Sequence, residues 1–235
     1  MKNIFITLFS VFILFTFISC ASKESTTYDY TYDYTLDEDT FINEGDDREV
    51  GDNFLANIDP VYLPSLFFLK KSGKKMVPKE VSKVAIVPRT NAVEWHFYDG
   101  TNNIAIILRK AERDKIFEAC NQFLEKYESK TLEHTKVGKK NAYFVSKCSV
   151  WYGLLSAANG CEANNYYVTH EFVNKRPYLL LRFLPTRSTD EDNYSYTPKI
   201  SLYMSPSQIR DFLEQMSQEE LEAAIQVNKQ KAYTY

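Results

Sequence analysis

Few residues of this chain have the types and spacing that catalysis requires. His170 and Glu171 are adjacent, a pair that could transfer protons or bind a metal, but neighbouring residues of a strand point to opposite faces. Lys71-Ser72-Gly73-Lys74-Lys75 resembles part of a phosphate-binding loop, yet Phe68 stands where that loop needs its first glycine. The sequence has no nucleophile elbow, no His-Glu-x-x-His and no Cys-x-x-Cys. We therefore expect no catalytic residues, no metal site and no cofactor.

Cys20 is the residue with the clearest predicted chemistry. It follows Lys2 and an apolar run at Ile4–Ile18, which is shorter than the roughly 20 residues that a membrane-spanning helix needs. Phe17-Ile18-Ser19-Cys20 resembles a lipobox, the motif whose cysteine receives a lipid. Ordinary signal-peptidase cleavage after Ala21 is the alternative.

The lipobox predicts the start and the location of the mature chain. Residues 1–19 are then a lipoprotein signal peptide, and fatty acids such as palmitate on Cys20 would hold the protein on a membrane of a bacterial cell envelope. The sequence does not distinguish the inner from the outer membrane, or the periplasmic from the surface face.

Three further cysteines leave an odd number. Cys120 falls on the apolar side of an expected helix and is predicted to be a small buried hydrophobe. Cys148 and Cys161 flank a loop-like segment at 157–160, and a disulfide between them would stabilise the fold by about 3 kcal/mol in the chain-entropy model. Two unpaired thiols are the alternative, and the sequence leaves both open.

Lysines crowd two connections of the chain. The first contains Lys70, Lys71, Lys74, Lys75, Lys79 and Lys83, and the second contains Lys136, Lys139, Lys140 and Lys147. Charge runs of this kind are usually solvated loops. The alternative is that Lys74, Lys75, Lys139 and Lys140 form one basic face for an anionic lipid, a cell-wall polymer or an acidic envelope protein. Nucleic acid is not an expected partner.

The charge is divided unevenly along the chain. Residues 21–59 contain twelve acidic residues and two basic ones, a net charge of −10, whereas residues 60–235 carry +6. Tyr28-Asp29-Tyr30-Thr31 is repeated immediately as Tyr32-Asp33-Tyr34-Thr35. Residues 20–59 are therefore predicted to be a disordered acidic tether to a basic folded body.

The first half of the body predicts strands followed by a helix. The expected strands are Val61–Leu69, Val81–Val87, Ala92–Tyr98 and Asn103–Leu108. Asp99-Gly100 is a strong hairpin signal between the last two. Apolar residues with a period of 3.6 predict a helix at Lys110–Glu128.

The second half predicts the same order. The expected strands are Asn141–Leu154, Asn164–Val173, Pro177–Leu184 and Lys199–Met204, and the expected helix is Pro206–Met216. Ser205 and Gln208 suit a capping box, and Pro206 suits the first helical position.

The repeated order predicts an α+β fold with a largely antiparallel sheet and two helices. We expect it to be built from two similar units at 60–130 and 136–220, within a body at 60–220 and before a helical or frayed tail at 221–235. An offset of 96 residues, which aligns Ile104 with Ile200 and Phe117 with Leu213, supports this duplication.

Several segments carry a family resemblance. Besides the lipobox and the polar tether they are the strand Glu94-Trp95-His96-Phe97-Tyr98, the strand Asn103–Leu108, Arg113 at a helix start and the strand Pro198–Met204. Together they resemble uncharacterised spirochaete lipoproteins of the treponemal type, a group that implies no activity. In topology alone, the predicted units are similar to Whirly and PUR-type repeats.

These features predict a noncatalytic binding or interaction module tethered to the cell envelope, with an unknown ligand. The competing prediction is an envelope hydrolase whose site is assembled from residues distant in the sequence.

Overall fold

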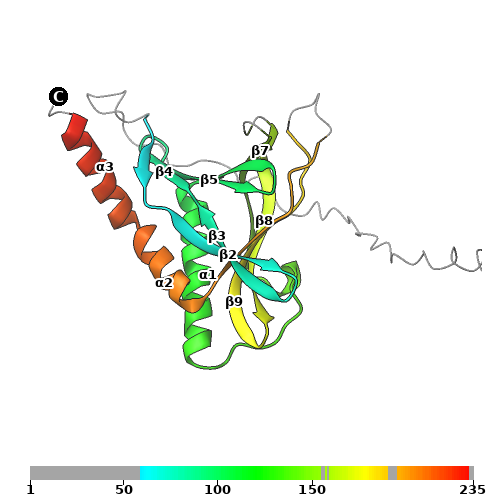
Figure 1. Cartoon of the computed structure of the whole chain (residues 1–235). Helices are drawn as coiled ribbons and strands as arrows, with labels where there is room; N and C mark the ends of the chain where they lie inside the picture. Colours follow the sequence, from blue (N-terminus) through cyan, green and yellow to red (C-terminus); the bar gives the residue numbers. More distant parts are fainter. Residues whose placement is uncertain (1–58, 155–156, 158, 190–194, 233–235) are drawn as a thin grey trace, which may run out of the picture. The chain divides into compact units, whose positions relative to one another are not determined.

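A computed structural model describes residues 59–154, 157, 159–189 and 195–232. The predicted signal peptide, Cys20 and nearly all of the predicted tether lie outside these residues. The strands are β1 (Val61–Leu63), β2 (Leu66–Ser72), β3 (Lys75–Val81), β4 (Lys83–Val87), β5 (Ala92–Asp99), β6 (Asn102–Leu108), β7 (Phe144–Gly153), β8 (Asn159–Val173), β9 (Arg176–Phe183) and β10 (Ile200–Met204) (Figure 1). The α-helices are α1 (Lys110–Glu128), α2 (Pro206–Gln215) and α3 (Gln218–Ala232).

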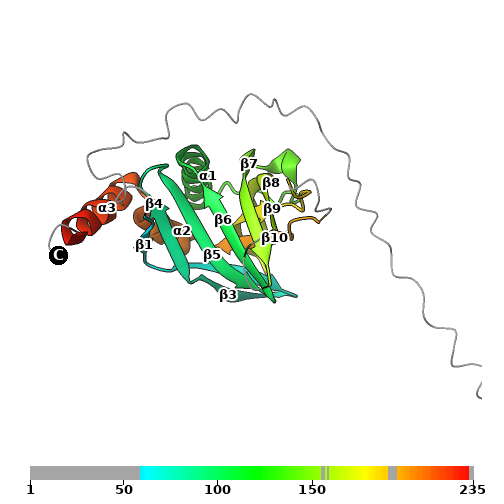
Figure 2. The same ribbon diagram turned by 90° about the horizontal axis from the view of Figure 1, so that it is seen from above.

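All ten strands form one antiparallel sheet in the order β1-β4-β5-β6-β7-β8-β9-β10-β2-β3. The hairpin β2–β3 therefore lies at the opposite end of the strand order from β4, although β4 follows it directly in the chain. The sheet is strongly curved and brings β3 and β5 together, although they are far apart in the strand order. The Lys79 ammonium of β3 lies 5.2 Å from the centre of the Phe97 ring of β5 and donates to the Tyr98 carbonyl. Figure 2 shows this arrangement from above.

One large core joins the sheet to all three helices. Trp95 of β5 is fully buried and packs against Phe68 of β2 and Phe212 of α2, with ring centres 5.3 and 5.9 Å apart. Ile116 of α1 and Leu221 of α3 belong to the same hydrophobic cluster. Burial of this continuous apolar surface is the main stabilising term of the fold.

The helix ends follow from local sequence. The Ser205 hydroxyl accepts from the Gln208 backbone N–H, and the Gln208 side chain accepts from the Ser205 backbone N–H at 3.1 Å, so the predicted capping box is confirmed. At the start of α1, the Arg109 backbone N–H donates to the Glu112 carboxylate at 2.9 Å. Both contacts satisfy backbone donors that a helix start leaves free.

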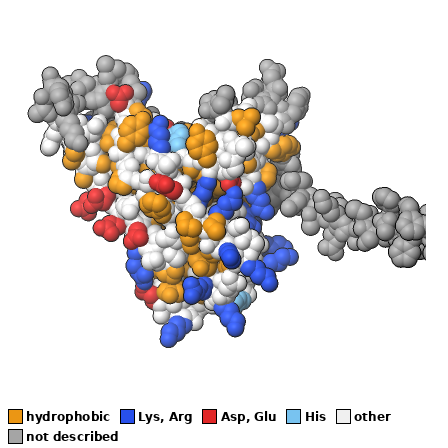
Figure 3. All heavy atoms as spheres, in the orientation of Figure 1, with side chains coloured by type: hydrophobic (Ala, Val, Ile, Leu, Met, Phe, Trp, Pro, Cys, Tyr) orange, Lys and Arg blue, Asp and Glu red, His pale blue; other side chains and the backbone are white. Residues whose placement is uncertain are grey.

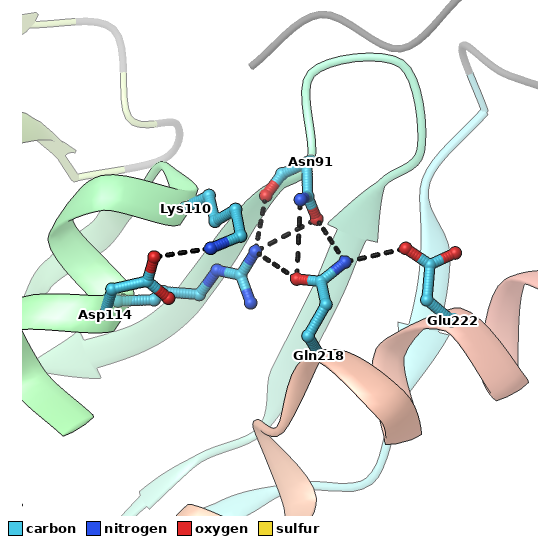
Figure 4. Close-up of polar contacts among 6 residues, drawn as sticks. Asn91, Lys110, Asp114, Gln218 and Glu222 are labelled. Carbon is cyan, nitrogen blue, oxygen red and sulfur yellow. Dashed lines mark hydrogen bonds and ion pairs between the residues drawn. The ribbon is translucent and has the colours of Figure 1, made fainter. Parts of the chain in front are cut away.

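A buried arginine connects α1 to two distant segments. Arg113 is only 3% exposed, and its Nη2 donates to the Asn91 carbonyl at 2.9 Å, the Asn91 side-chain oxygen at 3.0 Å and Gln218 Oε1 at 3.3 Å. Gln218 Nε2 donates in turn to Glu222 at 2.7 Å (Figure 4). Asn91 has a φ of 54°, a left-handed conformation that asparagine tolerates better than most residues. The network fixes the β4–β5 turn against the start of α3.

The predicted fold class is wrong. The ten strands form one sheet with three helices, a mostly-β architecture, and not two similar α+β units with one helix each. The expected halves do not separate, because β6 of the first half pairs with β7 of the second, and β10 pairs back with β2. Both halves also contribute to the same core cluster, so neither can bury its apolar face alone.

Candidate anion-binding site

The two lysine-rich connections meet over a small second hydrophobic cluster. This cluster consists of Val173, Tyr178, Leu180 and Tyr203, with Leu69, Met76 and Val137 packed against it. Met76 follows the first Gly-Lys-Lys and Val137 precedes the second, so both connections cover the same part of the sheet. Asn174, in the β8–β9 turn, donates to the Lys74 carbonyl at 2.7 Å and fixes the β2–β3 turn there.

The four lysines of the predicted basic face are solvent-exposed. Lys74 and Lys75 lie in and after the β2–β3 turn, where Gly73 has a φ of 58° that suits glycine. Lys139 and Lys140 lie in a short 3-10 helix at Lys139–Asn141. Figure 3 shows basic side chains gathered on the lower part of the visible face and acidic ones on its left side. The placement is compatible with a shared basic face, and its use as a binding site stays a prediction.

Beside these connections, β2 and β10 diverge and leave a hollow. Every residue of β10 pairs with β9 and every residue of β2 pairs with β3, whereas β2 and β10 share only the pair Leu69 and Tyr203. The hollow has a volume of about 390 Å³. It is lined by Lys70, Lys71, Gly73, Asp99, Arg182, Lys199, Ser201 and Tyr203.

Two of the four cations in this hollow already have carboxylate partners. Lys70 forms an ion pair with Asp99, and Lys71 forms one with Glu171. The Tyr203 hydroxyl donates to the same Glu171 carboxylate at 2.7 Å. Burial by itself would raise the pKa of Glu171, but the hydrogen bonds from Lys71 and Tyr203, together with the charges of Lys71 and Arg182, lower that pKa below its usual value, so the carboxylate is ionised at neutral pH.

The other two cations, Arg182 and Lys199, form no ion pair with any residue that the structure describes. Arg182 Nη2 lies 3.5 Å from the Tyr203 hydroxyl oxygen, and Arg182 Nε is buried without a hydrogen-bond partner in the described part of the chain. Lys199 is exposed at the rim. The residues around the hollow therefore carry more positive than negative charge. The Arg182 guanidinium also has an Nε–H donor without an acceptor among the described residues.

Sequence reasoning found Lys70 and Lys71 but missed Arg182, Lys199, Ser201 and Tyr203. The last two stand in an alternating apolar strand that gives no chemical signal. Arg182 is the one charged residue between Pro177 and Phe183, a stretch of β9 whose other residues are buried or partly buried. This charge within an otherwise apolar stretch could have indicated the site, because charged residues are rarely buried unless they are paired.

The three cysteines that the structure describes, Cys120, Cys148 and Cys161, are buried and unpaired in it. Burial raises the pKa of Cys120 to about 12, so the thiol stays neutral, which fits its predicted role as a small buried hydrophobe. Cys148 and Cys161 lie on paired strands, but a bulge sets Cys148 opposite Asn164 and Cys161 opposite Val150. The pairing of Cys148 with Cys161 stays a prediction that only oxidised protein can test.

His170 and Glu171 lie on opposite faces, as the strand alternation predicted. The His170 ring contacts Phe123 of α1 and donates from Nε2 to the Glu133 carbonyl at 2.8 Å, while Glu171 faces the hollow. The Tyr143 hydroxyl lies 3.1 Å from His170 Nδ1, so both ring nitrogens have partners. Among the described residues, no group of three or more His, Cys, Asp or Glu side chains is arranged to hold a metal ion.

No described helix combines the length and the apolar character that crossing a bilayer requires.

Comparison with known proteins places the chain in a family. A family model described as an uncharacterised Treponema protein matches residues 60–223. An uncharacterised protein of Treponema pallidum (strain Nichols) is 21% identical over 148 residues, which are 63% of this chain and 53% of that protein. The chain thus spans about half the length of this relative. No solved structure matches significantly.

The resemblance to treponemal proteins is confirmed by these matches, whereas lipidation and the similarity to Whirly and PUR-type repeats stay predictions. Because the family model covers more than half of the chain, the chain belongs to this family of uncharacterised Treponema proteins.

Proposed function

We propose that this protein is a noncatalytic binding module, held at the cell envelope by a lipid on Cys20, that recognises an anionic ligand with the basic surface around the β2–β10 hollow. The observation that carries the proposal is the hollow itself. Four cations line it, and among the described residues only the carboxylates of Asp99 and Glu171 form ion pairs with them. A concave site with an excess of one charge concentrates the opposite charge from solution.

The surrounding lysines extend this positive surface. Lys74 and Lys75 continue the strand pair that forms one wall, and Lys139 and Lys140 lie in the connection that covers the neighbouring cluster. Exposed charges of this kind act at a distance and are screened by salt, because the Debye length falls from about 10 Å at 0.1 M to about 3 Å at 1 M. The proposal therefore requires binding that weakens as the salt concentration rises.

Binding to anionic surfaces tests this proposal. The protein from residue 20 onward, with Cys20→Ala to remove the lipid, is mixed with anionic vesicles or cell-wall fragments across a salt series. We expect salt-dependent binding that falls severalfold when Lys74, Lys75, Lys139 and Lys140 are all changed to Gln. Lys229→Gln, on α3 away from the hollow, is the control for loss of charge alone. Binding that is absent, or that is equal in all three proteins at every salt concentration, contradicts the proposal.

The anchor requires a separate test. Cys20→Ala in the full chain should abolish fatty-acid labelling and move the protein from the detergent phase to the aqueous phase, because no other lipidation motif is predicted. A parent protein that takes up no label and partitions as the variant does would contradict the lipoprotein prediction.

A further inference from the structure

We propose that Arg182, Lys199 and Ser201 form a binding site for a phosphate monoester inside the β2–β10 hollow. This inference rests on the proposed function and deepens it, because it names the ligand chemistry and the residues that select it.

The strand register places the three side chains together. Arg182 of β9 pairs directly with Ser201 of β10, so the two side chains are neighbours on one face of the sheet. Lys199 lies two positions before Ser201, and the alternation of strand residues directs it to that same face. All three line the hollow, as does Tyr203 on the other side of Ser201.

Most donors of these residues have no acceptor in the described part of the chain. Arg182 has a buried Nε without an acceptor, and its one contact is the 3.5 Å approach of Nη2 to the Tyr203 oxygen. Lys199 has no ion pair and Ser201 no side-chain hydrogen bond among the residues described. A buried donor without an acceptor costs free energy, which an oxyanion between these groups would recover.

The nearby carboxylates form their direct ion pairs with other lysines. Glu171 pairs with Lys71 and accepts from Tyr203, and Asp99 pairs with Lys70, so Arg182 feels Glu171 only through space and Lys199 has no carboxylate partner among the described residues. Two cations without a direct ion pair match a phosphate monoester, which carries about −1.5 to −2 at pH 7. A single carboxylate would leave one positive charge unmatched.

The shape of the site also favours phosphate. An arginine guanidinium presents parallel N–H donors that fit two phosphate oxygens, and a lysine and a hydroxyl can serve the remaining oxygens of a tetrahedral group. The volume of about 390 Å³ is at the small end of ligand sites, which suits a phosphate with a small substituent and not a bulky ligand.

Calorimetric titration of the protein from residue 20 onward, carrying Cys20→Ala, tests the site. The probe is glycerol phosphate, and acetate, which carries a single negative charge, is the control. We expect saturable binding of glycerol phosphate, at least about tenfold tighter than that of acetate, because acetate satisfies only one of the two cations. Equal affinity for the two probes, or no saturable binding, would overturn the inference.

Variants locate the binding. Arg182→Lys keeps the charge but loses the paired donors, and Lys199→Gln removes one exposed charge, so each should weaken glycerol phosphate binding about tenfold or more. Because Lys199 is exposed, Lys199→Gln should fold normally, so it tests the site even if Arg182→Lys does not fold. Lys229→Gln should bind as the parent does, and unchanged affinity in both hollow variants would refute the site.

Vesicles distinguish the source of the phosphate. Binding to vesicles that contain phosphatidic acid, competed by glycerol phosphate, would identify a lipid headgroup, whereas binding of glycerol phosphate alone would identify a soluble ligand. Salt-dependent binding to anionic surfaces that is insensitive to Arg182→Lys and Lys199→Gln would leave the proposed function standing and refute the phosphate site.

Discussion

Replacing Trp95 with alanine should lower the free energy of unfolding by about 4 kcal/mol, a large part of the roughly 5–15 kcal/mol that stabilises a native protein. The side chain is fully buried and lies 5.3 Å from the Phe68 ring and 5.9 Å from the Phe212 ring, so its removal opens a cavity between β2, β5 and α2. These three elements come from both ends of the chain and cannot close the cavity independently. Urea unfolding followed by circular dichroism measures the loss.

Trp95→Phe is the matched control. It keeps an aromatic ring and removes the indole N–H, which is buried and has no hydrogen-bond partner among the described residues. The loss of that unsatisfied donor offsets part of the lost packing, so we expect a cost well below half that of alanine. Two variants of equal stability would show that Trp95 does not fill the centre of the core.

Arg113→Met should lower the free energy of unfolding by about 3 kcal/mol. The change keeps most of the apolar stem but leaves the Asn91 carbonyl and the oxygens of Asn91 and Gln218 without their common donor. The contacts connect the start of α1 to the β4–β5 turn and to α3, so hydrogen exchange should accelerate at all three places.

Gln218→Ala is the control for this network. It removes the 3.3 Å acceptor of Arg113 and the bonds of the Gln218 amide to Asn91 and Glu222, but it leaves the two shorter contacts from Arg113 to Asn91, so we expect a smaller cost than for Arg113→Met. Arg113→Met without a measurable effect on stability or exchange would mean that the guanidinium is a surface group, contrary to its 3% exposure.

The local elements were predictable where one periodic pattern decided them. The helix at Lys110–Glu128 has the predicted bounds, and Asp99-Gly100 forms the expected β5–β6 hairpin, with Gly100 at a φ of 65°. Both depend on neighbours within the chain, which sequence patterns describe well.

The missed elements depend on contacts between distant residues. The strand expected at Val61–Leu69 is two strands, β1 and β2, which pair with different partners, β4 and β3. The sequence does not predict β3, because Lys75, Pro78 and Lys79 have a low propensity for strands. β3 is an edge strand, where such residues are tolerated and prevent pairing with other chains.

The candidate site escaped prediction for the same reason. The lysines near Gly73 and Gly138 were visible as charge runs, but the hollow exists only because β2 leaves β10 after one residue pair. Arg182 is placed beside the hollow by its pairing with Ser201 and Tyr167, residues distant in the sequence, which no local pattern encodes. The prediction of the fold class was wrong for a related reason. The offset of 96 residues shows that two segments have similar patterns, but it does not show that their strands join one sheet.

The position of β2 at the far end of the strand order also governs the order of folding. Gln208 donates to the carbonyl of Phe67, which lies 141 positions earlier in the chain, so the β2–β3 hairpin joins the sheet through β2 only after β10 and α2 have formed. Contacts of such long sequence separation slow folding, because a long loop must close before they stabilise anything. During synthesis or export the hairpin must wait with Leu66 and Phe68 uncovered, and a chain truncated before β10 should therefore be a substrate for chaperones and proteases and not a smaller folded domain.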